Sequence, residues 1–239
     1  MKLASLKGGR DGRLVVVSDD LAYFAYAGHI ATTLQDVLDN WELLAPKLEL
    51  LATDLNHAVI PRERFHERDA ASPLPRAYQR LSADGACLRS DRLGGPRDPV
   101  TAGTGAVGEV VVVTGDVAAG PSAAEACAAI RLVGLSNVGG GLSPVLVTPD
   151  TLGARWQAGR LQGILNSDIN GEAQSRADAS ATDFAALVAS VAREVPLSAG
   201  TIIGSGGDPT ILRSGDCARI WMDDDKHHPI FGVIEQVVG

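Results

Sequence analysis

A run of β-branched residues in the middle of the chain limits the fold more than any other feature. Between Gly108 and Gly115 the sequence reads Gly-Glu-Val-Val-Val-Val-Thr-Gly. Four consecutive valines show no alternation of apolar and polar residues, so they predict a buried strand. The chain has 239 residues, which is long enough to bury a core around such a strand without a disulfide or a metal for stability.

Residues 1–70 predict a small amino-terminal α/β domain of short strands followed by a helix. The expected strands cover residues 2–6, 14–18 and 23–29, with a glycine-rich turn at 8–12. Over residues 33–55 the apolar side chains recur at intervals of three and four, which indicates a helix. Thr33 and Asp36 are spaced like a capping box at its start, and Pro46 is expected to break or end its first part.

Residues 71–239 predict mostly strands with a few helices. Residues 72–99 are rich in proline and glycine and predict a connecting region with little regular structure. Asn170-Gly171 predicts a two-residue hairpin turn. Residues 223–228, Asp-Asp-Asp-Lys-His-His, have the composition of a metal cluster, but two flanking strand patterns favour a solvated hairpin turn. Further strands and helices are expected at 108–115, 122–135, 142–150, 161–169, 182–195, 197–203, 217–222 and 230–238.

Composition excludes several classes of protein. The net charge is −8 and the basic residues are scattered, which disfavours a nucleic-acid partner. Three cysteines far apart in the sequence do not make a disulfide framework or a zinc knuckle. There is no apolar run long enough for a membrane helix and no leader pattern, so we expect a cytoplasmic protein without a membrane partner.

Short stretches along the chain match one known family, in the same order. They are residues 1–7, 11–18, 73–78, 95–99, 108–116, 128–133, 143–150, 168–172, 200–206 and 230–235. In these stretches, which cover nearly the whole chain, it resembles bacterial two-domain fumarylacetoacetate hydrolase family proteins. The resemblance implies an α+β fold, in which a small amino-terminal domain (1–70) precedes a mixed β-roll (71–239). It also implies a homodimer and hydrolysis or decarboxylation of β-diketo or acylpyruvate acids with Mg²⁺ or Ca²⁺.

The sequence departs from the family where the family holds its metal. The family's Glu-x-Glu pair falls on residues 107–109, where Val107 replaces the first glutamate and Glu109 remains. The family's metal-binding aspartate falls near Asn137 and its histidine near Ser90. The segment at 208–215 is also shorter than the family's.

These departures remove the family's chemistry. Mg²⁺ and Ca²⁺ need several oxygen ligands, carboxylates above all, so one glutamate and a neutral amide hold too little charge. We therefore expect no cofactor, neither Mg²⁺ nor Ca²⁺. Glu109 is the candidate catalytic acid/base, against the alternative of a leftover carboxylate bonded to backbone. The candidate substrate-binding residues are Tyr78, Arg89, Ser90, Asn137, Gly204, Ser205 and Gly206, of which the last three could equally be a tight turn.

Three functions remain open. The first is a repurposed, metal-independent enzyme that isomerises, cyclises or decarboxylates an enolisable keto small molecule through Glu109 and backbone donors. The second is a non-catalytic family relative that acts as a binding or partner subunit. The third is a metal-dependent hydrolase of a C–C bond that uses ligands elsewhere in the chain. The scaffold stretches are kept while the chemical positions have changed, which favours the first.

Overall fold

The computed structural model describes residues 1–87, 93–105, 108–137, 140–207 and 210–239. The predictions for Arg89, Ser90 and Val107 fall outside these residues. Over the described residues, nine strands form one mixed sheet with the order β4-β3-β2-β1-β9-β8-β7-β14-β5. These strands are β1 (Lys2–Leu6), β2 (Arg13–Val17), β3 (Tyr23–Tyr26), β4 (Glu63–Arg64), β5 (Gln79–Leu81), β7 (Gly108–Thr114), β8 (Ile130–Asn137), β9 (Leu146–Val147) and β14 (Thr201–Gly204).

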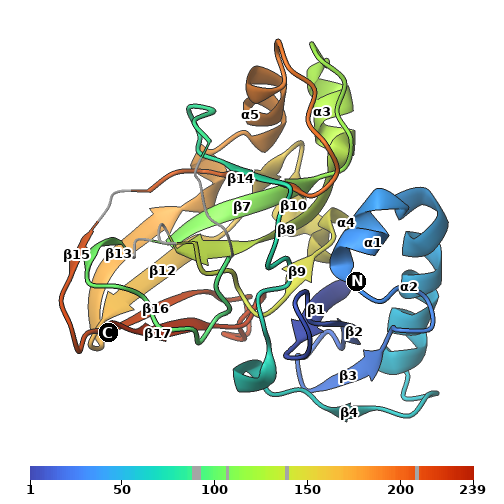
Figure 1. Cartoon of the computed structure of the whole chain (residues 1–239), viewed down its shortest axis with the longest axis horizontal. Coiled ribbons are helices and arrows are strands. Elements are labelled where there is room, and N and C mark those ends of the chain that lie inside the picture. Colours follow the sequence, from blue (N-terminus) through green and yellow to red (C-terminus); the bar gives the residue numbers. More distant parts are fainter. Residues whose placement is uncertain (88–92, 106–107, 138–139, 208–209) are drawn as a thin grey trace.

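Smaller sheets and several helices make up the rest of the regular structure in the described ranges. A four-stranded sheet has the order β13 (Glu172–Asp178), β12 (Ile164–Ile169), β16 (Cys217–Met222), β17 (Ile234–Val237). The short pairs are β10 (Trp156–Gln157) with β11 (Arg160–Leu161), and β6 (Gly103–Gly105) with β15 (Thr210–Leu212). The helices are α1 (Leu34–Asp39), α2 (Trp41–Asn56), η1 (Glu67–Asp69), α3 (Ala123–Ala129), α4 (Pro149–Leu152), η2 (Gly153–Arg155), η3 (Ala179–Ala181) and α5 (Phe184–Val191). Helices α1 and α2 lie beside the amino-terminal strands, whereas α3 and α5 lie together at the far end of β7 (Figure 1).

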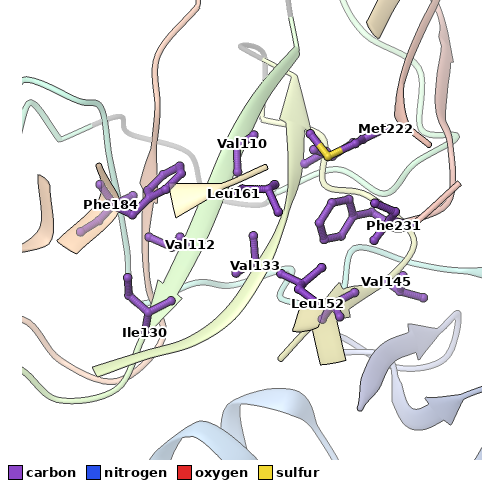
Figure 2. Packing of buried hydrophobic residues seen from close by; sticks show 14 of the residues in the cluster. Val110, Val112, Ile130, Val133, Val145, Leu152, Leu161, Phe184, Met222 and Phe231 are labelled. Atoms are coloured by element: carbon purple, nitrogen blue, oxygen red, sulfur yellow. The ribbon is translucent and has the colours of Figure 1, made fainter. Parts of the chain in front are cut away.

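The valine run forms β7, and the prediction of a buried strand is confirmed. Val110 and Val112 belong to one buried cluster, which Figure 2 shows together with Phe184 and Phe231. Val111 and Val113 point to the opposite face and belong to a second cluster, which also contains residues of α1 and α2. Successive side chains of a strand alternate between the two faces of a sheet, so one strand serves both cores.

The helix predicted over 33–55 is two helices, and the prediction for Pro46 is wrong. The side chain of Thr33 accepts a hydrogen bond from the Asp36 amide and caps α1, as expected. The break lies at Asn40, which ends α1 and begins α2. Pro46 lies inside α2, near its start, where it removes one backbone bond. The helix continues because its apolar side packs on the core.

The predicted hairpins are present. Asn170 and Gly171 both have positive φ and join β12 to β13, with Ile169 paired to Glu172. Residues 223–229 form the connection from β16 towards β17, and the side chain of Asp224 accepts from the amides of Lys226 and His228. These contacts support the hairpin-turn interpretation over the metal cluster.

The amino-terminal strands and the rest of the chain share the large sheet. Strand β1 pairs with β9 through Lys2↔Val147 and Leu3↔Leu146. The α+β fold class is confirmed, whereas the boundary at residue 70 and the term β-roll remain predictions. Residues 72–99 hold one unexpected element, β5, at the edge of the sheet. None of the helices in the described ranges is long and apolar enough to cross a membrane.

Candidate functional site

Glu109 is buried on β7 and forms an ion pair with an arginine. Its Oε1 accepts a hydrogen bond of 2.6 Å from Nη2 of Arg80, and both side chains are only 5% exposed. A buried carboxylate without a positive partner would be costly, so this pairing is what allows the charge to lie inside. Arg80 was not among the residues predicted from the sequence.

The order of the strands explains why the two residues meet. Arg80 lies on β5, which pairs in parallel with β14 through Ile202↔Arg80. Strand β14 pairs with β7, and β7 pairs with β8 through Glu109↔Ser136. The four strands are neighbours, so side chains on one face of them can converge. Nothing local in Tyr78-Gln-Arg-Leu indicates this, because the contact depends on strand order.

The Nη2 atom of Arg80 has three oxygen acceptors. Besides Glu109 Oε1, it donates to Ser136 Oγ at 3.1 Å and to the backbone carbonyl oxygen of Asn137 at 3.0 Å. Ser136 Oγ also donates to that carbonyl, at 2.8 Å. The guanidinium is therefore fixed by a carboxylate, a hydroxyl and a peptide group at once.

The glycine-rich turn after β14 holds the other side of the carboxylate. The Gly206 amide donates to Glu109 Oε2 at 3.2 Å. The Ser205 amide donates to Val110 O, and Ser205 Oγ accepts from the Val110 amide. A Cβ at Gly204 would overlap Glu109 Oε2, so only glycine at this position lets the carboxylate lie so close to the backbone of β14. The turn thus binds a carboxylate of the protein itself, through the Gly206 amide. That Gly204, Ser205 and Gly206 bind a substrate remains a prediction.

Asn137 does not share a face with Glu109, although the two were grouped from the sequence. Glu109 is paired with Ser136, whereas Asn137 is paired with Gly108, one residue further along each strand. Neighbouring residues of a strand point to opposite faces, so Ser136 is the side chain that faces Glu109. The Asn137 side chain instead donates to Gln236 Oε1 and accepts from the Gly141 amide. Only its backbone carbonyl reaches Arg80.

The remaining predicted residues do not join this cluster. Tyr78 lies just before β5 and is 68% exposed, so its role in binding stays a prediction. Arg89 and Ser90 lie outside the described residues. Three buried polar residues on strands were not predicted from the sequence: Arg80, Ser136 and Gln236. A polar residue within a strand pattern is the only local signal for them, and many exposed strands carry the same signal.

Known proteins share this fold. Residues 1–76 match the family model described as Fumarylacetoacetase N-terminal domain 2. The maleylpyruvate hydrolase from Sphingobium sp. SYK-6 superposes with a TM-score of 0.75 at 16% identity, covering 100% of this chain and 99% of that one. A fumarylacetoacetate hydrolase from psychrophilic Exiguobacterium antarcticum gives 0.70 at 17%, covering 100% and 99%. No protein of curated function matches the sequence. The chain thus has the fumarylacetoacetate hydrolase fold.

The family-model match covers the amino-terminal residues alone, and over its whole length the chain shares the fold of fumarylacetoacetate hydrolases. The Sphingobium hydrolase has also been solved in complex with manganese(II) and pyruvate, with a TM-score of 0.74, 17% identity and coverage of 100% and 98%. That structure raises the question of whether residues here fit such a metal.

The described residues do not fit a divalent metal at this position. Within the described ranges, no group of three or more His, Cys, Asp or Glu side chains is arranged to hold an ion. Glu109 has a guanidinium on one oxygen and an amide on the other. Ser136 is a neutral hydroxyl, and the Asn137 side chain faces away. A hard cation needs several free, charged oxygen ligands, which this cluster lacks.

Proposed function

We propose that the protein is a metal-independent enzyme of the fumarylacetoacetate hydrolase family that acts on an enolisable keto small molecule. The observation that supports this proposal is the carboxylate of Glu109, which is buried on β7 with a guanidinium as its counter-charge. The reaction would be an isomerisation, a cyclisation or a decarboxylation. We further propose that the protein acts in the cytoplasm as a homodimer.

The two charged groups suit proton transfer at carbon. The Glu109 carboxylate takes a proton from the carbon beside the substrate's keto group, and the electron pair of that C–H bond passes to the keto oxygen. Arg80 stabilises the enolate, because its positive charge lies beside the developing negative charge. Returning the same proton to another carbon of the conjugated system completes an isomerisation, with no oxidant or added cofactor.

Proton exchange tests this role without knowledge of the natural substrate. Acetylpyruvate in D₂O with EDTA would be followed by NMR for loss of its α-proton signal. The wild type is expected to catalyse exchange, and Glu109→Gln to lose it by about 100-fold or more. Glu172→Gln, which changes an exposed glutamate of β13, is the matched control and should keep the wild-type rate. Equal rates for Glu109→Gln and wild type would remove Glu109 from the mechanism.

The second candidate function, a non-catalytic binding or partner subunit, is favoured by one observation. Both oxygens of Glu109 accept hydrogen bonds from the protein, and both members of the ion pair are nearly inaccessible. Such a pair can serve structure alone. Co-purification with an intact family member and no exchange by the isolated chain would support it. A homodimer that turns over substrate would exclude it.

A metal-dependent C–C hydrolase is the third candidate. It is disfavoured by the neutral and already engaged groups around Glu109. Exchange or hydrolysis that appears only when Mn²⁺ or Mg²⁺ is added, and is lost with EDTA, would restore this candidate in place of the first.

A further inference from the structure

The three acceptors of Arg80 Nη2 surround one point. Glu109 Oε1 lies 2.6 Å from this nitrogen, the Asn137 carbonyl oxygen 3.0 Å and Ser136 Oγ 3.1 Å. Several oxygens that converge on one centre, with at least one carboxylate among them, are the surroundings that a hard cation takes in proteins. Here the centre is a nitrogen of a protein side chain.

We infer that Arg80 Nη2 occupies a cation position of this fold, so that the protein carries a fixed positive charge where a divalent ion would otherwise bind. The inference goes beyond the proposed function, because it identifies what replaces the metal and does not depend on any turnover. It also explains why one carboxylate suffices: a guanidinium carries one charge and Glu109 balances it.

Arg80 is held firmly enough to exclude an ion. Its backbone belongs to β5 and pairs with β14, and the side chain is only 5% exposed. Gly140 also packs against it, since a Cβ at Gly140 would lie 3.0 Å from Nη1. A divalent cation would have to displace a paired guanidinium from this packed position and then meet one carboxylate and two neutral oxygens.

The strand register shows how to convert the cluster into a metal site. Ser136 faces Glu109, so Ser136→Asp would place a second carboxylate on the same face. Arg80→Ser removes the guanidinium and leaves its space. The double variant Arg80→Ser/Ser136→Asp therefore offers two carboxylates, a carbonyl and an empty centre.

The test is isothermal titration of Mn²⁺ into purified proteins. We expect no binding to the wild type at millimolar Mn²⁺ and binding of about one ion to Arg80→Ser/Ser136→Asp. Arg80→Ser/Asn137→Asp is the matched control: it adds the same carboxylate one residue along, on the opposite face, and should not bind. Arg80→Lys/Ser136→Asp keeps a positive charge at the centre and should not bind either.

Thermal unfolding of the same four proteins with and without Mn²⁺ provides the second measurement. Two unpaired buried carboxylates destabilise the designed variant, so Mn²⁺ should raise its Tm and leave the Tm of the others unchanged. If Arg80→Ser/Ser136→Asp does not bind Mn²⁺, or if Mn²⁺ does not raise its Tm, the inference is overturned but the proposed function is not. Equal binding by the Asn137→Asp control would also overturn it. Stoichiometric binding by the wild type would overturn both the inference and the metal-independent function.

Discussion

Strands β7 and β8 carry two polar clusters on opposite faces, and they are built differently. On one face, Arg80, Glu109 and Ser136 form a charged cluster. On the other, Asn137 and Gln236 form a neutral cluster in which amide groups pair with each other and with backbone. Both clusters are buried, yet only the first contains charges that depend on each other. Neighbouring residues of one strand therefore have different chemical surroundings, and substituting them should lower the free energy of unfolding by different amounts.

The largest expected loss of stability follows from removing one charge of the buried ion pair. Arg80→Met leaves the Glu109 carboxylate buried without its counter-charge and should lower the free energy of unfolding by about 3–5 kcal/mol. Urea denaturation followed by circular dichroism measures this. The double variant Arg80→Met/Glu109→Gln removes both charges and should recover most of the loss. A single variant that loses less than about 1 kcal/mol would show that the pair is not buried as described.

A smaller loss of stability is expected when a side chain at the end of β14 crowds Glu109. In Gly204→Ala the new methyl group overlaps Glu109 Oε2, which is already bonded to Gly206, so one of them must move. We expect a loss of about 2–3 kcal/mol in unfolding free energy. Gly28→Ala is the matched control, since a Cβ there has no neighbour within 4 Å, and it should be nearly neutral. Equal Tm values for the two variants would contradict the close approach.

A substitution in the neutral cluster should lower the free energy of unfolding less than a substitution in the charged cluster. Asn137→Ala removes the hydrogen-bond partner of Gln236 Oε1 and of the Gly141 amide, which should lower the unfolding free energy by about 1–2 kcal/mol. Asn166→Ala, which removes a side-chain bond to the nearby Ile164 carbonyl in a more exposed place, is the control and should change the unfolding free energy little. A loss for Asn137→Ala as large as that for Arg80→Met would erase the contrast between the faces.

The smallest effect is expected at an accessible ion pair. Arg160 and Asp183 lie 2.9 Å apart, like the buried pair in distance, but their side chains are 41% and 34% exposed. Arg160→Met should change the unfolding free energy by less than about 1 kcal/mol, because water solvates the remaining carboxylate. Added salt should reduce even that difference. A large loss here would mean that exposure does not distinguish the two pairs.

Much of the fold could be predicted because its signals are local. The valine run of β7, the cap at Thr33 and the Asn170-Gly171 turn each depend on a few consecutive residues. The helix break was misplaced because Pro46 is a strong breaker in isolation, whereas the packing of α2 tolerates it and the chain breaks at Asn40.

The site was only partly predictable, because it depends on strand order and register. Glu109 was found from the sequence and is buried in the sheet as a charged group. Its partner Arg80 lies 29 residues earlier and meets it only because β5 and β7 flank β14. The grouping of Asn137 with Glu109 failed by a single residue of register, which in a strand reverses the face.

The most direct test of the guanidinium in the cation position is crystallographic. Crystals of the wild type grown with millimolar Mn²⁺ would be measured at the manganese absorption edge. We predict no anomalous peak beside Glu109 and clear density for the Arg80 guanidinium on Glu109 Oε1. An anomalous peak coordinated by Glu109, with Arg80 turned away, would contradict this.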